Sequence, residues 1–311
     1  MTTRVSDFGQ NALTQYQMMQ LETQVSNLQA QIGSGQTSQT FDGIAPNAQR
    51  LVNLQADNSN VTQYLADTNL ATQRLTSQQN TVTSLLSLAT NVQTLLVNAS
   101  NSNNASSVAL NQSAQSQLQE VAGLLNTQFE GQYLFSGTAS NTPPVNLSAP
   151  GFSPPGNTYP STPDTAYYQG NNTSLSVQAD DNFNVQYGAS ANAPGFEELI
   201  RALNLAATTD TVSGQVDTQR LQEALGVIKQ SISDITNVQA TLGVQQSVLS
   251  NTQTTQNQVQ LQLQQNVGDI QNVDVAQVAT SLSAAQNNLE SSFAVTARLS
   301  QLSLINFLPV P

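Results

Sequence analysis

The side chains that could carry out chemistry are few in this chain of 311 residues, because it contains no histidine and no cysteine. The commonest general base, the usual zinc ligands and the thiolate nucleophile are therefore absent. A serine–lysine pair would have to use Lys229, the only lysine. Lys229 follows Leu225 and Ile228 in a helical apolar series, which favours an exposed lysine with its stem along the helix. Gly33-Ser34-Gly35 lacks the later glycine and the lysine of a phosphate-binding loop.

Acidic residues stand next to each other at Asp180-Asp181 and at Glu197-Glu198. Adjacent residues on a strand or a helix point in different directions, so neither pair predicts a general acid and base acting together. A hairpin turn accounts for the first pair, and favourable charge in the first turn of a helix accounts for the second. Asp164 with Asp180 and Asp181 would offer carboxylates to calcium, but no loop spacing supports such a site. We therefore expect no enzyme activity, no bound metal and no cofactor.

Composition points to long helices rather than to a broad core. Hydrophobic residues make up 38% of the chain, whereas tryptophan is absent and aromatic residues make up 5%. Burial must therefore come from Leu, Val, Ile and Ala, which suit narrow helical bundles. The polar helix faces would consist of Gln, Asn, Ser and Thr, since only 8% of residues are charged. Closely packed copies with such faces would repel one another little.

The net charge of -12, with a pI near 4.1, argues against two classes of partner. Seven basic residues scattered between Arg4 and Arg298 cannot form the continuous positive track that binds nucleic acid. An anionic membrane surface is disfavoured for the same reason. We expect no contact with nucleic acid or membrane, although a merely soluble acidic surface would also explain the charge.

The start of the chain, from Met1 to Gln10, has one positive charge and no apolar run like that of a secretory signal. No window of the sequence approaches the ~18 to 20 apolar residues needed to span a bilayer. The lack of cysteine leaves the redox compartment open. These features indicate a cytoplasmic protein, or one exported by a route that needs no cleaved signal.

Apolar residues recur three and four residues apart near both ends of the chain, as they do in coiled coils. Each series forms one stripe on a helix, and a terminal helix with such a stripe needs a partner that covers it. We expect the two ends to meet each other or their copies in neighbouring molecules, and packing within one core is the alternative. The predicted assembly interface consists of Met18, Leu21, Val25, Leu28, Ile32, Leu282, Leu289, Phe293, Leu299 and Leu302.

Between these ends the same periodicity predicts further helices, separated by glycine, proline and polar turns. Phe41 and Ile44 are expected to anchor the loop after the first helix. Gln132 to Ser136 predicts a strand, and alternation on either side of Asp180-Asp181-Asn182 predicts a β-hairpin. The predicted helices cover residues 7–32, 46–99, the stretch between Ser107 and Gly131, a short piece from 195, about 221–267, and, after a turn at Gly268-Asp269, about 275–303.

The expected fold is mainly α, an elongated coiled-coil or helical-bundle rod formed by both chain ends with a small β and loop insertion in the middle. The insertion is marked by composition, because eight of the eleven prolines and four of the seven tyrosines lie between Ala139 and Gly195. The expected segments are an N-terminal assembly helix and loop (1–45), a helical hairpin (46–138), a variable outer β/loop domain (139–194), return helices (195–267) and a C-terminal assembly helix (268–311).

Several motifs resemble those of the flagellin superfamily of bacterial flagella, over roughly residues 1–138 and 195–308. Their agreement in order and position makes the resemblance fairly specific. The basic residue and the second aspartate usual in the family's first loop are missing here, which removes a salt bridge expected there but leaves the fold. The motifs are Arg4-Val5-Ser6, Gly33 to Gln36, Asp42 to Ala45, Asp269-Ile270, Val273 to Ala276 and Leu302 to Leu308.

Within the family, Gly131 to Thr138 and Phe196 to Leu203 look more like the branch that joins hook and filament than like filament flagellin. The resemblance implies a structural subunit of the flagellar axis whose terminal helices form an inner coiled coil and whose insertion forms an outer domain. It implies copies of the chain, neighbouring axial proteins and an export chaperone as partners. It also implies an extracellular place in the flagellum after export through the type III channel without a cleaved signal.

Two alternative functions stay open. One is filament flagellin, the main subunit of the filament. The other is a secreted coiled-coil adhesin or binding module that contacts a ligand through Tyr159, Tyr167 and Tyr168, although such residues also pack inside small domains. Deletion of residues 139–194 is expected to separate the classes, because a structural subunit would still assemble and a binding module would lose its function.

Overall fold

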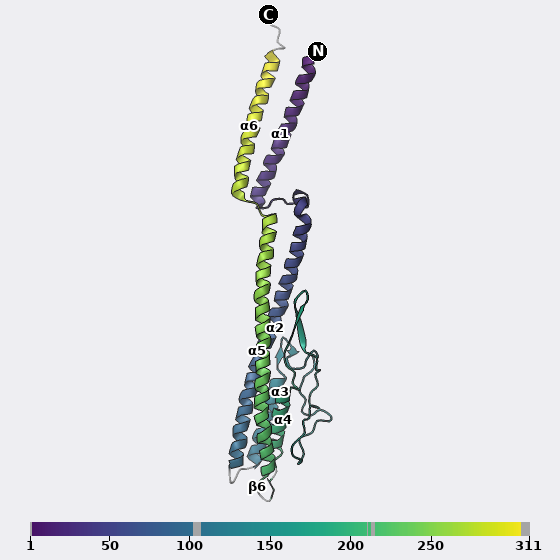
Figure 1. Cartoon of the computed structure of the whole chain (residues 1–311), viewed down its shortest axis with the longest axis vertical. Helices are drawn as coiled ribbons and strands as arrows, with labels where there is room; N and C mark the ends of the chain where they lie inside the picture. Colours follow the sequence, from purple (N-terminus) through teal and green to yellow (C-terminus); the bar gives the residue numbers. More distant parts are fainter. Residues whose placement is uncertain (1, 102–106, 210, 213–214, 306–311) are drawn as a thin grey trace. The chain divides into compact units, whose positions relative to one another are not determined.

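Helices make up most of the described residues in the computed structural model (Figure 1). The structure describes residues 2–101, 107–209, 211–212 and 215–305, without the side chains of 2–8, 10–11, 107–108, 211–212, 215–216 and 299–305. The helices are α1 (Thr2–Ser34), the 3-10 helix η1 (Phe41–Ile44), α2 (Ala45–Asn101), α3 (Ser107–Leu125), α4 (Pro194–Ala207), α5 (Thr218–Gln271) and α6 (Val275–Ile305).

The strands of the described chain form three separate antiparallel pairs. They are β1 (Gln128–Phe129) with β2 (Gln132–Tyr133), β3 (Leu175–Asp180) with β4 (Phe183–Tyr187), and β5 (Thr211–Val212) with β6 (Gln215–Val216). In the longest pair Val177 lies opposite Val185, and the register shifts between Gln178 and Asp180. The predicted mainly helical fold with a small β insertion in the middle is confirmed.

The chain folds as two compact units, one of residues 1–60 with 260–311 and one of residues 61–259. The first contains α1, η1 and α6 with the first part of α2 and the last part of α5. The second contains the rest of α2 and α5 together with α3, α4 and all three strand pairs. The predicted assembly residues therefore fall in the first unit, and the predicted insertion falls in the second.

Uncharged side chains satisfy the polar faces of the long helices. Threonine and serine hydroxyls donate to the carbonyl four residues earlier, for example Thr90 Oγ1 to Leu86 O at 2.9 Å and Thr280 Oγ1 to Ala276 O at 2.9 Å. Among the described residues there is one ion pair, between Glu197 and Arg201. The polar surface of these helices therefore depends on hydrogen bonds far more than on charge.

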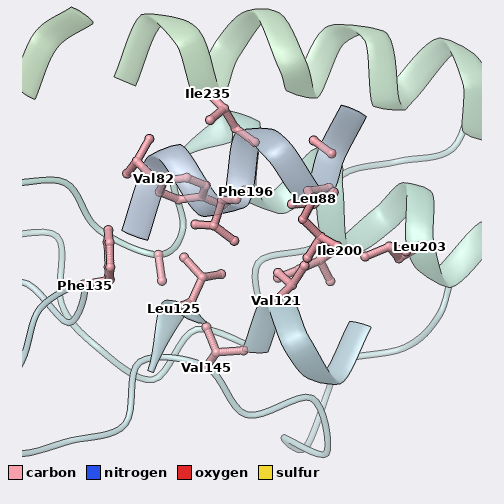
Figure 2. Close-up of a cluster of buried hydrophobic side chains, with 14 of the residues drawn as sticks. Val82, Leu88, Val121, Leu125, Phe135, Val145, Phe196, Ile200, Leu203 and Ile235 are labelled. Atoms are coloured by element: carbon pink, nitrogen blue, oxygen red, sulfur yellow. The ribbon is translucent and has the colours of Figure 1, made fainter. Parts of the chain in front are cut away.

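The core of the second unit is built from four helices. Side chains of α2, α3, α4 and α5 point into one cluster, as Figure 2 shows for Val82, Val121, Phe196 and Ile235. Phe196 meets Phe135 edge to face, with ring centroids 5.9 Å apart. The buried positions of α2 in this unit alternate three and four residues apart and include Ala71, Leu75, Gln78, Val82, Leu85, Ala89, Val92 and Leu96.

The segment between β2 and α4 contributes side chains to this core. Tyr167 is fully buried, donates its hydroxyl to Ala191 O at 3.0 Å and packs edge to face on Phe152. Burial raises the pKa of the Tyr167 hydroxyl. Tyr168 is half-buried, and its hydroxyl donates to Asn171 O at 2.6 Å. These tyrosines are packing residues, so they do not form the exposed aromatic surface that the adhesin hypothesis requires.

Three sequence-based expectations are wrong in detail. The third helix ends at Leu125, so Phe129 lies in β1, because Asn126 and Thr127 turn the chain into a hairpin. The turn expected at Gly268-Asp269 lies inside α5, which continues to Gln271 because neither residue stops a helix that is packed. Ile44 is buried as expected, whereas Phe41 is 58% exposed and is not the buried anchor that was expected.

Candidate assembly interface

The two terminal helices, α1 and α6, lie side by side and run in opposite directions (Figure 1). The residues of each helix that face the other recur at spacings of four and three, as in an antiparallel coiled coil. Thr296 Oγ1 lies 3.5 Å from Met18 Sδ, which fixes one point of the pairing. This α1–α6 seam comprises Met18, Leu21, Val25, Leu28 and Ile32 with Val278, Leu282, Ala285, Leu289, Ser292 and Thr296.

The turn after α1 is pinned to the turn before α6. Gly35 has φ +70 and its N–H donates to Gln31 O at 2.8 Å, a left-handed helix stop that glycine adopts without strain. Thr37 N donates to Gln271 O at 2.7 Å, and Val273 N donates to Gly35 O at 3.1 Å. The end of α1 is thereby held beside the start of α6.

Asp274 starts α6 at this turn. Its Oδ1 accepts from Ala276 N at 2.9 Å and from Gln277 N at 3.2 Å, as an N-terminal cap does. A small cluster of Ile44, Leu51 and Ile270 lies in the same unit. The motifs Gly33 to Gln36 and Val273 to Ala276 therefore stop one terminal helix and start the other.

The seam itself is thinly covered within one chain. Its five α1 residues are only half-buried, and on α6 only Val278 and Ala285 are buried. Toward the two chain ends, α6 places Ser292 and Thr296 in the seam where apolar residues would pack better. The α1–α6 pair alone is therefore a weakly stabilised element.

Large apolar side chains also point away from the seam. Leu13 is 57% exposed, Tyr16 56% and Met19 58% on α1, and Phe293 is 46% and Val295 53% exposed on α6. We call these five residues the outward set. The sequence analysis missed all but Phe293, because a search for one stripe leaves out apolar residues that lie off it. The signal that could have identified them is a short stretch with apolar residues both on the stripe and off it.

The structure places the predicted interface residues in three groups. Phe293 lies off the seam and is exposed. The side chains of Leu299 and Leu302 lie outside the described part of the chain, although both residues belong to α6. The structure brings together, in the α1–α6 seam, Met18, Leu21, Val25, Leu28, Ile32, Leu282 and Leu289.

Several carboxylates of the remaining polar clusters have structural partners. Glu197 pairs with Arg201 at 3.1 Å and accepts from Asp164 N, while Asp181 accepts from the Tyr64 hydroxyl at 2.6 Å. Within the described residues, no three His, Cys, Asp or Glu side chains stand close enough to hold a metal ion. Over the same residues, no helix has the length and apolarity of a membrane span.

Comparison with known families matches both ends of the chain. The model of the bacterial flagellin N-terminal helical region matches residues 5–140, and the model of the bacterial flagellin C-terminal helical region matches residues 225–308. Together they cover more than half of the chain, including α1 and α6. A search of curated protein sequences found no match.

Solved structures show the same fold at low sequence identity. A structure described as a flagellar hook-associated protein from Vibrio parahaemolyticus has 15% identity and a TM-score of 0.56, covering 74% of this chain and 100% of its own. FlgL from Bacillus cereus has 20% identity and a TM-score of 0.53, with 70% and 99% covered. FlgL from Xanthomonas campestris has 12% identity and a TM-score of 0.52, with 68% and 98% covered. With both terminal helical regions matched and this fold between them, the chain belongs to the bacterial flagellin family.

Proposed function

We propose that this protein is a structural subunit of the bacterial flagellar axis and that it stands at the junction between hook and filament. The observation that carries the proposal is the α1–α6 pair, which leaves the outward set exposed on the matched ends of the chain. The similar structures from Vibrio parahaemolyticus and Bacillus cereus, described as a hook-associated protein and as FlgL, support the junction role over that of filament flagellin.

The mechanism is assembly by burial. In one chain the α1–α6 seam holds the two ends together, and in the assembly the outward set contacts neighbouring copies or neighbouring axial proteins. Full burial of a side chain such as Phe293 contributes about 1.5–3 kcal/mol, so a few per subunit, repeated around a ring or helix, stabilise an assembly. Leu299 and Leu302 continue the α6 interface toward the chain end in this proposal.

Export and location follow from the same assignment. The subunit leaves the cell through the flagellar export channel with the help of a chaperone and acts outside it. A chain without cysteine or a metal cluster among its described residues can be unfolded and refolded without breaking such links. Its role is structural, and no enzyme activity is proposed.

A pair of substitutions tests the outward set. Tyr16→Ser with Phe293→Ser should reduce assembly at least about tenfold, because each removes on the order of 1 kcal/mol or more of burial per contact. The thermal unfolding of the monomer should stay unchanged, since both side chains are exposed there. Sedimentation and electron microscopy measure the assembly.

The matched control is Val97→Ser with Val244→Ser, two exposed apolar residues of the other unit. Normal assembly by the Tyr16/Phe293 variant, or equal loss in the control, would refute the outward set as the interface. Leu28→Asp in the seam should differ from both, because it also lowers the helix content of the monomer.

Electron microscopy of the purified protein separates junction subunit from filament flagellin. A junction subunit should form short rings or caps on isolated hooks and no long filaments by itself. Long self-formed filaments would instead identify the main filament subunit.

A further inference from the structure

Three glutamines on α5 reach across to α2 at intervals of seven residues. Gln239 Nε2 donates to Thr83 Oγ1 at 3.2 Å, and Gln246 Nε2 donates to Thr76 Oγ1 at 3.4 Å. Gln253 Nε2 donates to Asn69 Oδ1 at 3.1 Å and to Thr72 Oγ1 at 3.2 Å. We call these contacts the glutamine ladder. Each rung moves seven residues forward on α5 and seven residues back on α2, so the two antiparallel helices keep one register throughout.

The direction of each threonine rung is fixed. Thr83 Oγ1 donates its proton to Gln79 O at 2.8 Å, and Thr76 Oγ1 donates to Thr72 O at 2.9 Å. Each hydroxyl proton is therefore used within α2, and the oxygen is left to accept from the glutamine amide. Each threonine oxygen therefore accepts at a fixed position along α2, and a glutamine of α5 can bond to it only when the two helices are aligned.

The apolar residues by themselves do not fix this register. Buried positions recur at spacings of three and four on α2, for example Leu75, Gln78 and Val82, and at spacings of seven on this part of α5, at Ile235, Leu242 and Leu249. A slide of seven residues would therefore again place apolar residues opposite apolar residues, whereas a slide of one helical turn would break every rung of the ladder. No short loop sets the register either, because the rungs join residues 156 to 184 positions apart in the chain.

A slide of seven residues is opposed by buried side-chain hydrogen bonds that do not recur every seven residues. Gln78 Nε2 donates to Leu134 O, Gln256 Nε2 donates to Ala179 O at 3.0 Å, and Ser231 Oγ donates to Gly195 O at 2.7 Å. Each ties one of the two long helices to a different element of the core. A slide would leave these buried groups unpaired, which costs about 1–3 kcal/mol for each group.

We infer that the glutamine ladder is a register lock that sets the alignment of α2 against α5 through uncharged hydrogen bonds. In coiled coils, pairs of opposite charges beside the apolar seam set how the helices align. In this chain, which has few charges, uncharged hydrogen bonds have that role. The glutamine, threonine and asparagine side chains of the ladder do not titrate and form no ion pair. The lock therefore holds the same alignment at any pH and salt concentration in which the unit is folded.

Cysteine pairs test the alignment, since the natural chain has no cysteine. Gln246→Cys is combined with Thr76→Cys for the native pairing, or with Gln73→Cys or Asn80→Cys for a slide of one turn either way. A short thiol crosslinker should join the native pair fastest. Adding Gln239→Ala and Gln253→Ala should lower the ratio of native to shifted crosslinking about two- to fivefold, the loss expected for two exposed rungs.

The matched control is Gln222→Ala with Gln258→Ala, which removes two exposed glutamines of α5 whose side chains make no hydrogen bond within the described chain. It should leave the crosslinking ratio unchanged. Thr83→Val, which keeps the side-chain shape and removes the acceptor, should lower the ratio in the same direction as the glutamine substitutions. An unchanged ratio in the ladder variants, or an equal fall in the control, would overturn the register lock.

Discussion

The ionisation of the Glu198 carboxyl group is strongly altered by its surroundings. Gly195 lies so close to α5 that a Cβ there would meet Ile235 N at 2.6 Å, and this close approach of α4 brings Glu198 beside Asp234. Burial, and then the charge of Asp234, raises the pKa of Glu198 to about 7, while Arg201 opposes the shift. Its Oε2 is buried without a hydrogen-bond partner in the structure.

The raised pKa predicts how stability depends on pH. The folded chain holds the Glu198 proton more tightly than the unfolded chain, so stability falls as pH rises from about 4.5 to about 7 and is constant above. Glu198→Gln should remove the loss of stability that the ionisation of Glu198 causes. At pH 8 the variant should be more stable than the wild type by roughly 1 kcal/mol, a value reduced for solvent screening. At pH 4 the two should be equal.

Urea unfolding of both proteins at pH 4 and pH 8 measures the difference. Glu120→Gln, an exposed carboxylate of α3, serves as the control and should behave as the wild type. A variant that loses stability in parallel with the wild type across this range would contradict the assignment to Glu198.

At the scale of elements, two arginines fasten the proline-rich loop onto α4 and α5. Arg220 donates from Nε to Leu205 O at 2.9 Å, from Nη1 to Asn157 Oδ1 at 2.7 Å and from Nη2 to Pro155 O at 2.8 Å. Arg201 Nη1 donates to Ser161 O at 3.1 Å. Arg220 and Arg201 thus use the several donors of one guanidinium group to hold the loop.

Arg220→Ala should therefore destabilise the second unit by about 2–4 kcal/mol, because it removes a buried side chain together with its hydrogen bonds to Leu205 O, Asn157 Oδ1 and Pro155 O. Lys229→Ala is the matched control, since it removes an exposed positive charge from the same helix. It should change stability by less than about 0.5 kcal/mol. Thermal unfolding compares the two, and similar effects in both would show that the loop does not depend on Arg220.

At the scale of the whole molecule, the two units bury very different numbers of apolar side chains. The unit of residues 61–259 contains the large core, whereas the other unit has the small Ile44 cluster and the thinly covered α1–α6 seam. The segment 139–194 contributes Val145, Tyr167 and Val185 to the large core. Its complete deletion would therefore expose that core, and the loss of assembly in such a deletion would not by itself identify a binding module.

This division predicts the order of proteolysis. In the monomer, a protease should cut within α1 and α6 first and leave a resistant fragment close to residues 61–259, because weakly buried helices open more often. Assembly should protect the termini, since neighbouring copies cover the outward set. Mass spectrometry of the fragments before and after assembly tests this, and equal resistance of the termini in both states would argue against assembly through them.

The sequence by itself determined the type and order of the long helices, the main hairpin and the family. Helical periodicity, polar turns and the alternation around Asp180 are local patterns, so they predicted the long helices and the β3–β4 hairpin. The low charge and the lack of histidine and cysteine are properties of composition. The terminal stripes predicted coiled-coil helices at both ends, because a spacing of three and four residues places side chains on one face whatever covers that face.

Only the tertiary structure decided which residues meet. It paired α1 with α6 in one chain, left Phe293 outside the seam and put Tyr167 in the core. It also brought Gln239, Gln246 and Gln253 to their partners on α2. The α1–α6 pair and the glutamine contacts join residues more than a hundred positions apart. An apolar stripe is satisfied equally by several partners and registers. The choice among them depends on the packing and hydrogen bonding of the whole chain, which no local pattern contains.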